Sequence, residues 1–229
     1  MSESERAGAI CDQLATVRAR MAAAARDAGR AVDDITLVAV SKEQPERAIA
    51  DALACGQIEF GENRAQELVA KATALAHAEP APAWHFVGRL QRNKVRSLAP
   101  YVARWHSIDR VELVPELARH APATPAFVQV NLAREPQKGG CDPDATAALV
   151  ERLRDAGVPV DGLMTVPPVD RDPRPHFAAL RALAARLGLR QLSMGMTSDF
   201  EAAIGEGATC VRVGSAVFGP RPSGVGLRR

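Results

Sequence analysis

A lysine follows a short apolar run near the start of the chain, and its amine is the first group that could do chemistry. The run is Ile35–Ser41, and Val38, Val40 and Lys42 share one face through the two-residue alternation of a strand. If the valine face points into a core, the amine lies at the mouth of that core. A partly desolvated amine can attack a carbonyl group to form a Schiff base. The alternative is a lysine that simply reaches from the strand end into water.

Two glycine turns late in the chain are typical of a phosphate site. Gly195 is followed by Thr197 and Ser198, and Gly214 is followed by Ser215. Glycine lets backbone N–H groups approach an anion closely, and the hydroxyl groups add further donors. In barrels of parallel strands the loops after the last two strands commonly hold a phosphate. The alternatives are a helix cap that begins at Ser198 and an ordinary tight turn at Gly214.

An arginine precedes the second glycine turn and completes a plausible pocket. Arg212 alternates with Gly214, so it faces inward on the last predicted strand. When a barrel closes, its last strand pairs with its first, which brings Arg212 close to Lys42. Pyridoxal phosphate suits such a pocket, with Lys42 at the aldehyde, Arg212 at the ring nitrogen and the glycine turns at the phosphate. An ion pair between Arg212 and an inward carboxylate is the alternative.

Eight short runs rich in Val, Ile, Leu or aromatic residues are the strand candidates. They are Ile35–Ser41, Ile58–Phe60, Trp84–Gly88, Trp105–Ile108, Ala126–Leu132, Gly162–Val166, Gln191–Met194 and Thr209–Val213. Helical spacing occurs between most of them, as in Pro45–Cys55, Ala65–Ala78, Asp144–Asp155 and Pro175–Leu187. This alternation predicts an α/β fold, a (β/α)8 barrel of the TIM type. An open, doubly wound sheet is disfavoured because no Gly-x-Gly-x-x-Gly turn is present.

The length of 229 residues suits one barrel domain that spans residues 1–229. An extra helix within residues 1–30, about Glu3 to Ala28, precedes the first strand and ends at Gly29. Little chain follows the eighth strand, so this helix is expected to take the place of the missing last helix. Residues 221–229 are expected to form a flexible tail.

Two further polar residues belong to the predicted site. Asn63 follows the second strand, and His85 lies on the third strand between Trp84 and Phe86. Each has a structural alternative, because Asn63 could cap the next helix and His85 could be a hydrogen-bonded core histidine.

Composition excludes several classes of function. Lys plus Arg number 29 and Asp plus Glu 27, a net charge of +2, which is too balanced to indicate nucleic-acid binding. Neither a secretory signal nor a membrane-spanning run is present, so we expect a cytoplasmic protein, which we take to be a monomer. The four cysteines are widely separated without a Cys-x-x-Cys pair, so we expect four reduced thiols and no zinc site.

Six ordered motifs resemble the pyridoxal phosphate homeostasis proteins, the YggS/PROSC family. They are Leu37–Lys42, Phe60–Asn63, Trp84–Lys94, Ser107–Asp109, Ser193–Met196 and Val211–Gly219. The resemblance implies a barrel similar to the N-terminal domain of alanine racemases, with pyridoxal phosphate bound to Lys42 as a Schiff base. It also implies that Asn63 lies by the cofactor, that Arg212 meets the pyridine nitrogen, and that Met196, Thr197, Gly214 and Ser215 surround the phosphate. The family usually has serine where this chain has Thr197, a change that keeps the hydroxyl group.

The residues favour a carrier of the cofactor over an enzyme. A racemase of this type needs a second acid or base, commonly a tyrosine from a C-terminal β domain, and the single tyrosine here, Tyr101, precedes the fourth strand. A cation at the ring nitrogen also disfavours its protonation and weakens the electron sink. We therefore expect a non-catalytic protein that holds pyridoxal phosphate reversibly and passes it to apo-forms of the enzymes that use it. A low-activity amino-acid racemase and a cofactor-free Schiff-base aldolase are the alternatives.

Overall fold

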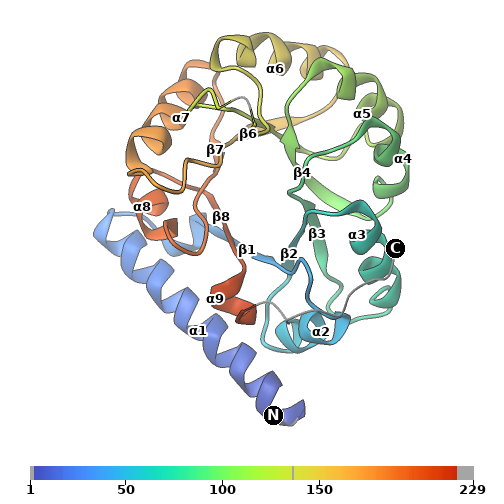
Figure 1. The fold of residues 1–229 in the computed structure, drawn as a ribbon, viewed down its shortest axis with the longest axis vertical. Helices are drawn as coiled ribbons and strands as arrows, with labels where there is room; N and C mark the ends of the chain where they lie inside the picture. The colour runs from blue at the N-terminus through green and yellow to red at the C-terminus, as the bar shows by residue number, and fades with distance from the viewer. Residues whose placement is uncertain (1–2, 136, 221–229) are drawn as a thin grey trace.

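Eight short parallel strands close into a barrel in the computed structural model, which describes residues 3–135 and 137–220 (Figure 1). Each strand pairs with its neighbours in chain order, and the last pairs with the first. The strands are β1 (Thr36–Val40), β2 (Glu59–Glu62), β3 (Ala83–Phe86), β4 (Val102–Ile108), β5 (Ala126–Gln129), β6 (Val160–Met164), β7 (Gln191–Ser193) and β8 (Cys210–Val213). The predicted (β/α)8 barrel is therefore confirmed, and each strand candidate is present with slightly different ends.

Helices surround the barrel, as Figure 1 shows. They are α1 (Glu3–Asp27), α2 (Glu46–Ala54), α3 (Ala65–Ala74), α4 (Val95–Leu98), α5 (Val114–His120), α6 (Thr146–Asp155), α7 (Arg174–Arg186), α8 (Phe200–Gly205) and α9 (Ser215–Phe218). In α7 the buried residues Phe177, Leu180 and Ala184 recur at intervals of three and four, so one stripe packs inward. Among the described residues, no helix has the length and apolar character needed to span a bilayer.

The opening helix α1 lies against the outside of the barrel where β8 meets β1. Its buried side chains recur every three or four residues, as Ile10, Leu14, Val17 and Met21 do, and the helix packs against α2, α8 and α9. Because α9 has only four residues, α1 supplies most of the outer cover at this joint. The expectation that α1 takes the place of a missing last helix is confirmed in part, because α1 covers this joint but the short α9 does follow β8. The expected tail, residues 221–229, lies outside the described residues.

The register between β8 and β1 fixes which inward side chains share a level. Val38 lies opposite Arg212, and Thr36 lies opposite Cys210. Lys42 therefore stands four residues beyond the level of Arg212, just past the end of its strand. The barrel has two mouths, a carboxyl mouth at the ends of the strands and an amino mouth at their starts.

The expectation of four reduced thiols is wrong, because Cys11 on α1 forms a disulfide with Cys55 at the end of α2. Their Cα atoms are 5.5 Å apart, although 44 residues separate them in the chain. The pairing follows from the packing of α1 against α2, which cysteine spacing alone does not reveal. Cys141 and Cys210 are free and buried.

Reduction of this disulfide should lower the melting temperature. A crosslink across 44 residues limits the unfolded chain and contributes about 4 kcal/mol by the loop-entropy relation. For a chain of this size that corresponds to roughly 8–16 °C. Calorimetry with and without dithiothreitol measures the shift, and Cys11→Ser should melt at the lower temperature under both conditions. Equal melting temperatures for the oxidised and reduced protein would contradict this expectation.

Candidate functional site

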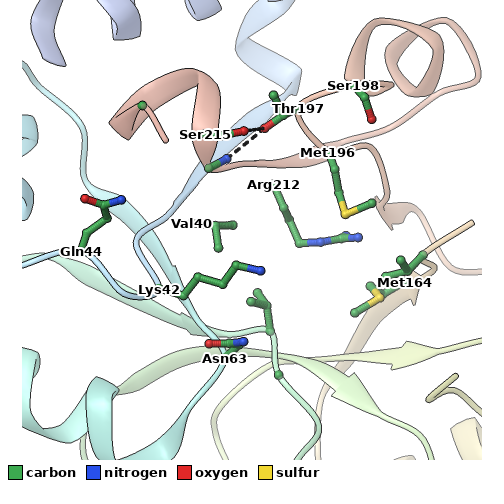
Figure 2. Close-up of a pocket in the computed structure, with 15 residues that line it drawn as sticks. Val40, Lys42, Gln44, Asn63, Met164, Met196, Thr197, Ser198, Arg212 and Ser215 are labelled. Carbon is green, nitrogen blue, oxygen red and sulfur yellow. Dashed lines mark hydrogen bonds between the residues drawn. The ribbon is translucent and has the colours of Figure 1, made fainter. Parts of the chain in front are cut away.

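A cavity of about 560 Å³ opens at the carboxyl mouth of the barrel. This volume lies within the usual range for small-molecule sites. Figure 2 shows its lining residues, which come from the ends of β1, β2, β3, β6, β7 and β8 and the turns after them. Eight of the nine predicted site residues line it, namely Lys42, Asn63, Met196, Thr197, Ser198, Arg212, Gly214 and Ser215. The structure thus brings together residues that are up to 173 positions apart in the chain.

Lys42 extends from the turn after β1 into this cavity, toward the space that Arg212 also faces (Figure 2). It is the only lysine among the described residues that line the cavity, and its side chain is partly buried. The next residue, Glu43, has a φ of 63°, a conformation that non-glycine residues rarely adopt. The surrounding structure must therefore hold this turn in place.

A network of buried charged side chains holds in place the turn that carries Lys42 and Glu43. The Lys71 ammonium donates to the Ser41 carbonyl oxygen at 2.6 Å and to the carboxylates of Glu62 and Glu67, each at 2.7 Å. The Ser41 hydroxyl also donates to Glu62 at 2.6 Å, and the Glu43 backbone N–H donates to Glu67 at 2.5 Å. Sequence reasoning missed Lys71, although a charge in the buried stripe of α3, between Leu68 and Ala72, was a signal.

Lys71→Met should destabilise the protein in a pH-dependent way. Burial raises the pKa of Glu62, and the Lys71 charge counters that rise. Without this cation the carboxylate is buried and unpaired, which costs about 3–5 kcal/mol. A folded pKa raised above the unfolded value means that stability is present at low pH and is lost as pH rises. Urea unfolding should therefore show a larger loss at about pH 8 than at about pH 5.

The control for this prediction is Lys71→Met combined with Glu62→Gln, which removes the buried charge. The double variant should lose most of the pH dependence, because Glu62 no longer titrates. A single variant whose loss of stability is the same at both pH values would contradict the assignment.

Hydroxyl and backbone groups converge at the end of the cavity formed by the two glycine turns. The Gly214 backbone N–H donates to Thr197 Oγ1 at 3.3 Å, and the Ser215 hydroxyl donates to the same oxygen at 3.4 Å (Figure 2). Helix α8 begins at Phe200 with Asp199 as its N-cap residue, so Ser198 is not the cap that its sequence also allowed. The donors needed for an anion are therefore grouped here.

The structure explains why residue 195 is glycine, which the sequence did not reveal. Its φ is +93°, and an added Cβ would lie 2.6 Å from Ala203 Cβ and 2.9 Å from Phe200 Cα. The turn after β7 must therefore be glycine to pack against α8. This close approach aims Met196 and Thr197 at the cavity.

Arg212 is buried, and neutral oxygens hold its guanidinium group. Nη1 donates to the Ser193 hydroxyl at 2.5 Å and Nη2 donates to the Thr165 carbonyl oxygen at 2.9 Å. Burial lowers the pKa of Arg212 from its usual value. Within residues 3–135 and 137–220, no carboxylate forms an ion pair with Arg212, so the alternative of an inward ion pair is not found. Arg212 also lines the cavity.

His85, the ninth predicted site residue, does not line this cavity. It faces the amino mouth, where Nε2 lies 2.6 Å from Glu59 Oε2 and Nδ1 lies 2.7 Å from His106 Nε2. A smaller cavity of about 130 Å³ opens there and is lined in part by His85, Glu59 and Arg104. Of the two readings of the sequence, the hydrogen-bonded core histidine is the one that the structure shows.

Few groups in the cavity can transfer a proton. Among the described lining residues, Lys42 and Arg212 are the only ones that titrate, and arginine keeps its proton in proteins. No cluster of His, Cys, Asp or Glu in the described part of the chain has the arrangement of a metal site. The cavity thus offers one amine, one buried cation and a set of anion donors.

Comparison with protein families gives a match over most of the chain. Residues 13–222 match the model described as "Alanine racemase, N-terminal domain". The match spans all eight strands and both glycine turns.

Two curated relatives carry the same name. A protein of Pseudomonas aeruginosa is 41% identical over 225 residues, which cover 94% of this chain and 97% of that protein. A protein of Escherichia coli K12 is 38% identical and covers 93% of this chain and 97% of that protein. Both are named pyridoxal phosphate homeostasis protein.

Solved structures agree with this relationship. PipY of Synechococcus elongatus with pyridoxal phosphate bound is 36% identical, with a TM-score of 0.81 over 92% of this chain and all of that chain. A lysine/ornithine decarboxylase of Vibrio vulnificus, at 12% identity and a TM-score of 0.66, shares the fold over 92% of this chain and 62% of that one. The identities and the coverage together show that this chain belongs to the family of pyridoxal phosphate homeostasis proteins, built on the alanine racemase N-terminal barrel.

Proposed function

We propose that this chain binds pyridoxal phosphate in the cavity at the carboxyl mouth and carries it reversibly, as an intracellular regulator of the free cofactor. The proposal rests on one observation. A partly buried lysine amine, a buried arginine and a cluster of anion donors face a single cavity. The relative PipY, 36% identical to this chain, has a solved structure with pyridoxal phosphate bound.

Each lining group suits one part of this cofactor. The Lys42 amine suits the aldehyde, which it would hold as a Schiff base, and the Arg212 guanidinium suits the ring nitrogen, since it can only donate. Gly214, Ser215 and Thr197 would bind the phosphate, with Met196 and Ser198 beside it. Asn63 would lie beside the ring. Bound in this way, the cofactor supplies an electron sink for amino-acid chemistry.

The same residues favour a carrier over an enzyme. A racemase needs a second proton-transfer group on the other face of the cofactor, and Lys42 is the only suitable group among the described cavity residues. Tyr101 directly precedes β4 and so lies at the amino mouth, away from the cavity. The cation at Arg212 also keeps a proton off the ring nitrogen and weakens the electron sink.

An absorption spectrum before and after borohydride tests the binding proposal. Protein incubated with pyridoxal phosphate should show an imine band that borohydride removes, and the reduced protein should carry one pyridoxyl group by mass spectrometry. A protein that stays colourless and ignores the added cofactor would contradict the proposal and favour the aldolase alternative.

Deuterium exchange separates the carrier from the racemase alternative. With full occupancy, the wild-type protein should exchange little deuterium into the α-carbon of added amino acids. Rapid exchange, with racemisation of the amino acid, would instead identify an enzyme.

We further propose that residues 1–229 act as one barrel domain, that the protein is monomeric and cytoplasmic, and that its partners are apo-forms of pyridoxal phosphate enzymes. The cavity supports this role because it is open at the carboxyl mouth, where another protein can reach it. Size-exclusion chromatography with light scattering tests the monomer, and activation of an apo-enzyme by the loaded protein tests the transfer.

A further inference from the structure

A chain of hydrogen bonds crosses the barrel interior from the candidate site to the opposite mouth. Arg212 Nη1 lies 2.5 Å from Ser193 Oγ, which lies 2.8 Å from His106 Nδ1. His106 Nε2 lies 2.7 Å from His85 Nδ1, and His85 Nε2 lies 2.6 Å from Glu59 Oε2. The four residues from Arg212 to His85 are buried, whereas Glu59 is partly exposed at the amino mouth.

The direction of the hydrogen bonds is fixed at the two ends of the chain. Arginine has no acceptor, so Arg212 must donate to Ser193. An ionised carboxylate has no donor, so Glu59 must accept from His85 Nε2–H. The hydrogen bond from His85 lowers the pKa of Glu59, which keeps this carboxyl group ionised at neutral pH.

The residues between the ends then have an arrangement in which both imidazole rings are neutral. Ser193 accepts from Arg212, and its own proton is donated to His106 Nδ1. His106 consequently carries its proton on Nε2 and donates to His85 Nδ1, and His85 carries its proton on Nε2 for Glu59. Every bond then points from Arg212 toward the amino mouth, whereas the other arrangement of these contacts needs a doubly protonated His85 paired with Glu59 and a His106 that donates to Ser193.

Burial keeps the His106 ring neutral, because it holds the pKa of His106 well below its usual value. The positive charge of Arg104 on β4, which pairs with Asp161 at 2.9 Å, acts in the same direction. Burial raises the pKa of Cys210 to about 11, so this neighbour of Ser193 stays a thiol. Phe127 covers one side of His106, with 4.7 Å between ring centroids.

We infer that Ser193 and His106 are positioning residues that hold the Arg212 guanidinium in place for the cofactor ring, through a one-directional hydrogen-bond chain that ends at Glu59. Thr165 fixes Nη2 through its carbonyl oxygen, so Nη1 depends on Ser193 alone among the described contacts. The inference rests on the proposed role of Arg212 in binding pyridoxal phosphate. The direction of these hydrogen bonds, by contrast, is a property of the protein without ligand.

Histidine tautomers test the direction without any ligand. The chain has five histidines, so long-range ¹H–¹⁵N spectra of the labelled apo-protein can be assigned with single His→Gln variants. At neutral pH, His85 and His106 should both be neutral with the proton on Nε2. A proton on Nδ1 of His106, or a doubly protonated ring at either residue, would overturn the inference.

Ser193→Ala tests the positioning role. The change removes one hydroxyl group and leaves both Arg212 Nη1 and His106 Nδ1 without their partner. The dissociation constant of pyridoxal phosphate should rise about tenfold, and the ¹⁵N signals of His106 should move. The imine absorbance should also change in its pH dependence, because the guanidinium is less well fixed beside the ring nitrogen.

Thr146→Val is the matched control. Thr146 is also fully buried, and its hydroxyl donates at 3.1 Å to Asp142 on the outer side of the barrel. Its loss should leave cofactor affinity unchanged within about twofold. Equal affinities for Ser193→Ala and the wild type, or an equal loss in Thr146→Val, would overturn the positioning role. If the wild type forms no imine at all, the proposed function fails, and the tautomer spectra still decide the direction of the chain.

Discussion

Lys42→Ala should abolish the imine band that pyridoxal phosphate gives with the wild-type protein. The chain has only four lysines, and Lys42 is the one that lines the cavity. Lys71 is buried and its ammonium is engaged by three acceptors, while Lys138 pairs with Glu135 at 2.6 Å. The expected effect is complete loss of the band and of the pyridoxyl group fixed by borohydride.

Peptide mapping after reduction identifies the modified residue directly. Lys94→Ala is the matched control, because it removes a lysine outside the cavity lining and should leave the band intact. The fold of Lys42→Ala should be preserved, since a partly exposed side chain at a cavity contributes little to the core. A pyridoxyl group found mainly on Lys94 or Lys138 would refute the assignment.

The fold was predictable because each strand has a strong local signal. A run such as Val38–Val40, short and β-branched, is favoured in a buried parallel strand, and alternation with helices then leaves few topologies. The inward alternation on β8 also predicts that Arg212 and Gly214 share a face. Both signals depend on residues that are neighbours along the chain, so a single sequence is enough to detect them.

The mouth of the barrel that each inward side chain reaches was not predictable in the same way. Alternation states which face a side chain takes, whereas the stagger between strands decides which mouth it reaches. Cys210 and Arg212 share the inward face of β8, yet one lines the cavity at the amino mouth and the other lines the cavity at the carboxyl mouth. His85 was placed with the candidate site for this reason, although it lies with Glu59 at the opposite mouth.

Contacts between distant helices were also hidden. The network of Lys71 and the disulfide of Cys11 with Cys55 depend on how α3 and α1 pack on the barrel, and a single sequence does not identify the partners in either contact. Position 195 is a similar case, because the close approach of α8 is what requires glycine there. The residues of the candidate site were therefore predicted better than the contacts that hold them in place.

Gly214→Val should weaken the binding of pyridoxal phosphate far more than that of pyridoxal. The φ of Gly214 is −113°, so the backbone accepts a side chain, but an added Cβ would lie 3.2 Å from the Val40 carbonyl oxygen. The new side chain would lie beside Thr197 and Ser215, where the phosphate donors converge. Loss of charge-assisted hydrogen bonds there should raise the dissociation constant about 100-fold for the phosphorylated ligand.

Pyridoxal lacks the phosphate, so its affinity should fall by no more than about threefold if Gly214 acts through that group. Gly8→Val is the matched control, because it makes the same change on α1, where an added Cβ meets no atom within 4 Å. Circular dichroism should show the same fold for both variants, since the cavity lies in loops above the core. An equal loss of affinity for both ligands would place the phosphate elsewhere, because only a contact with that group can separate the two.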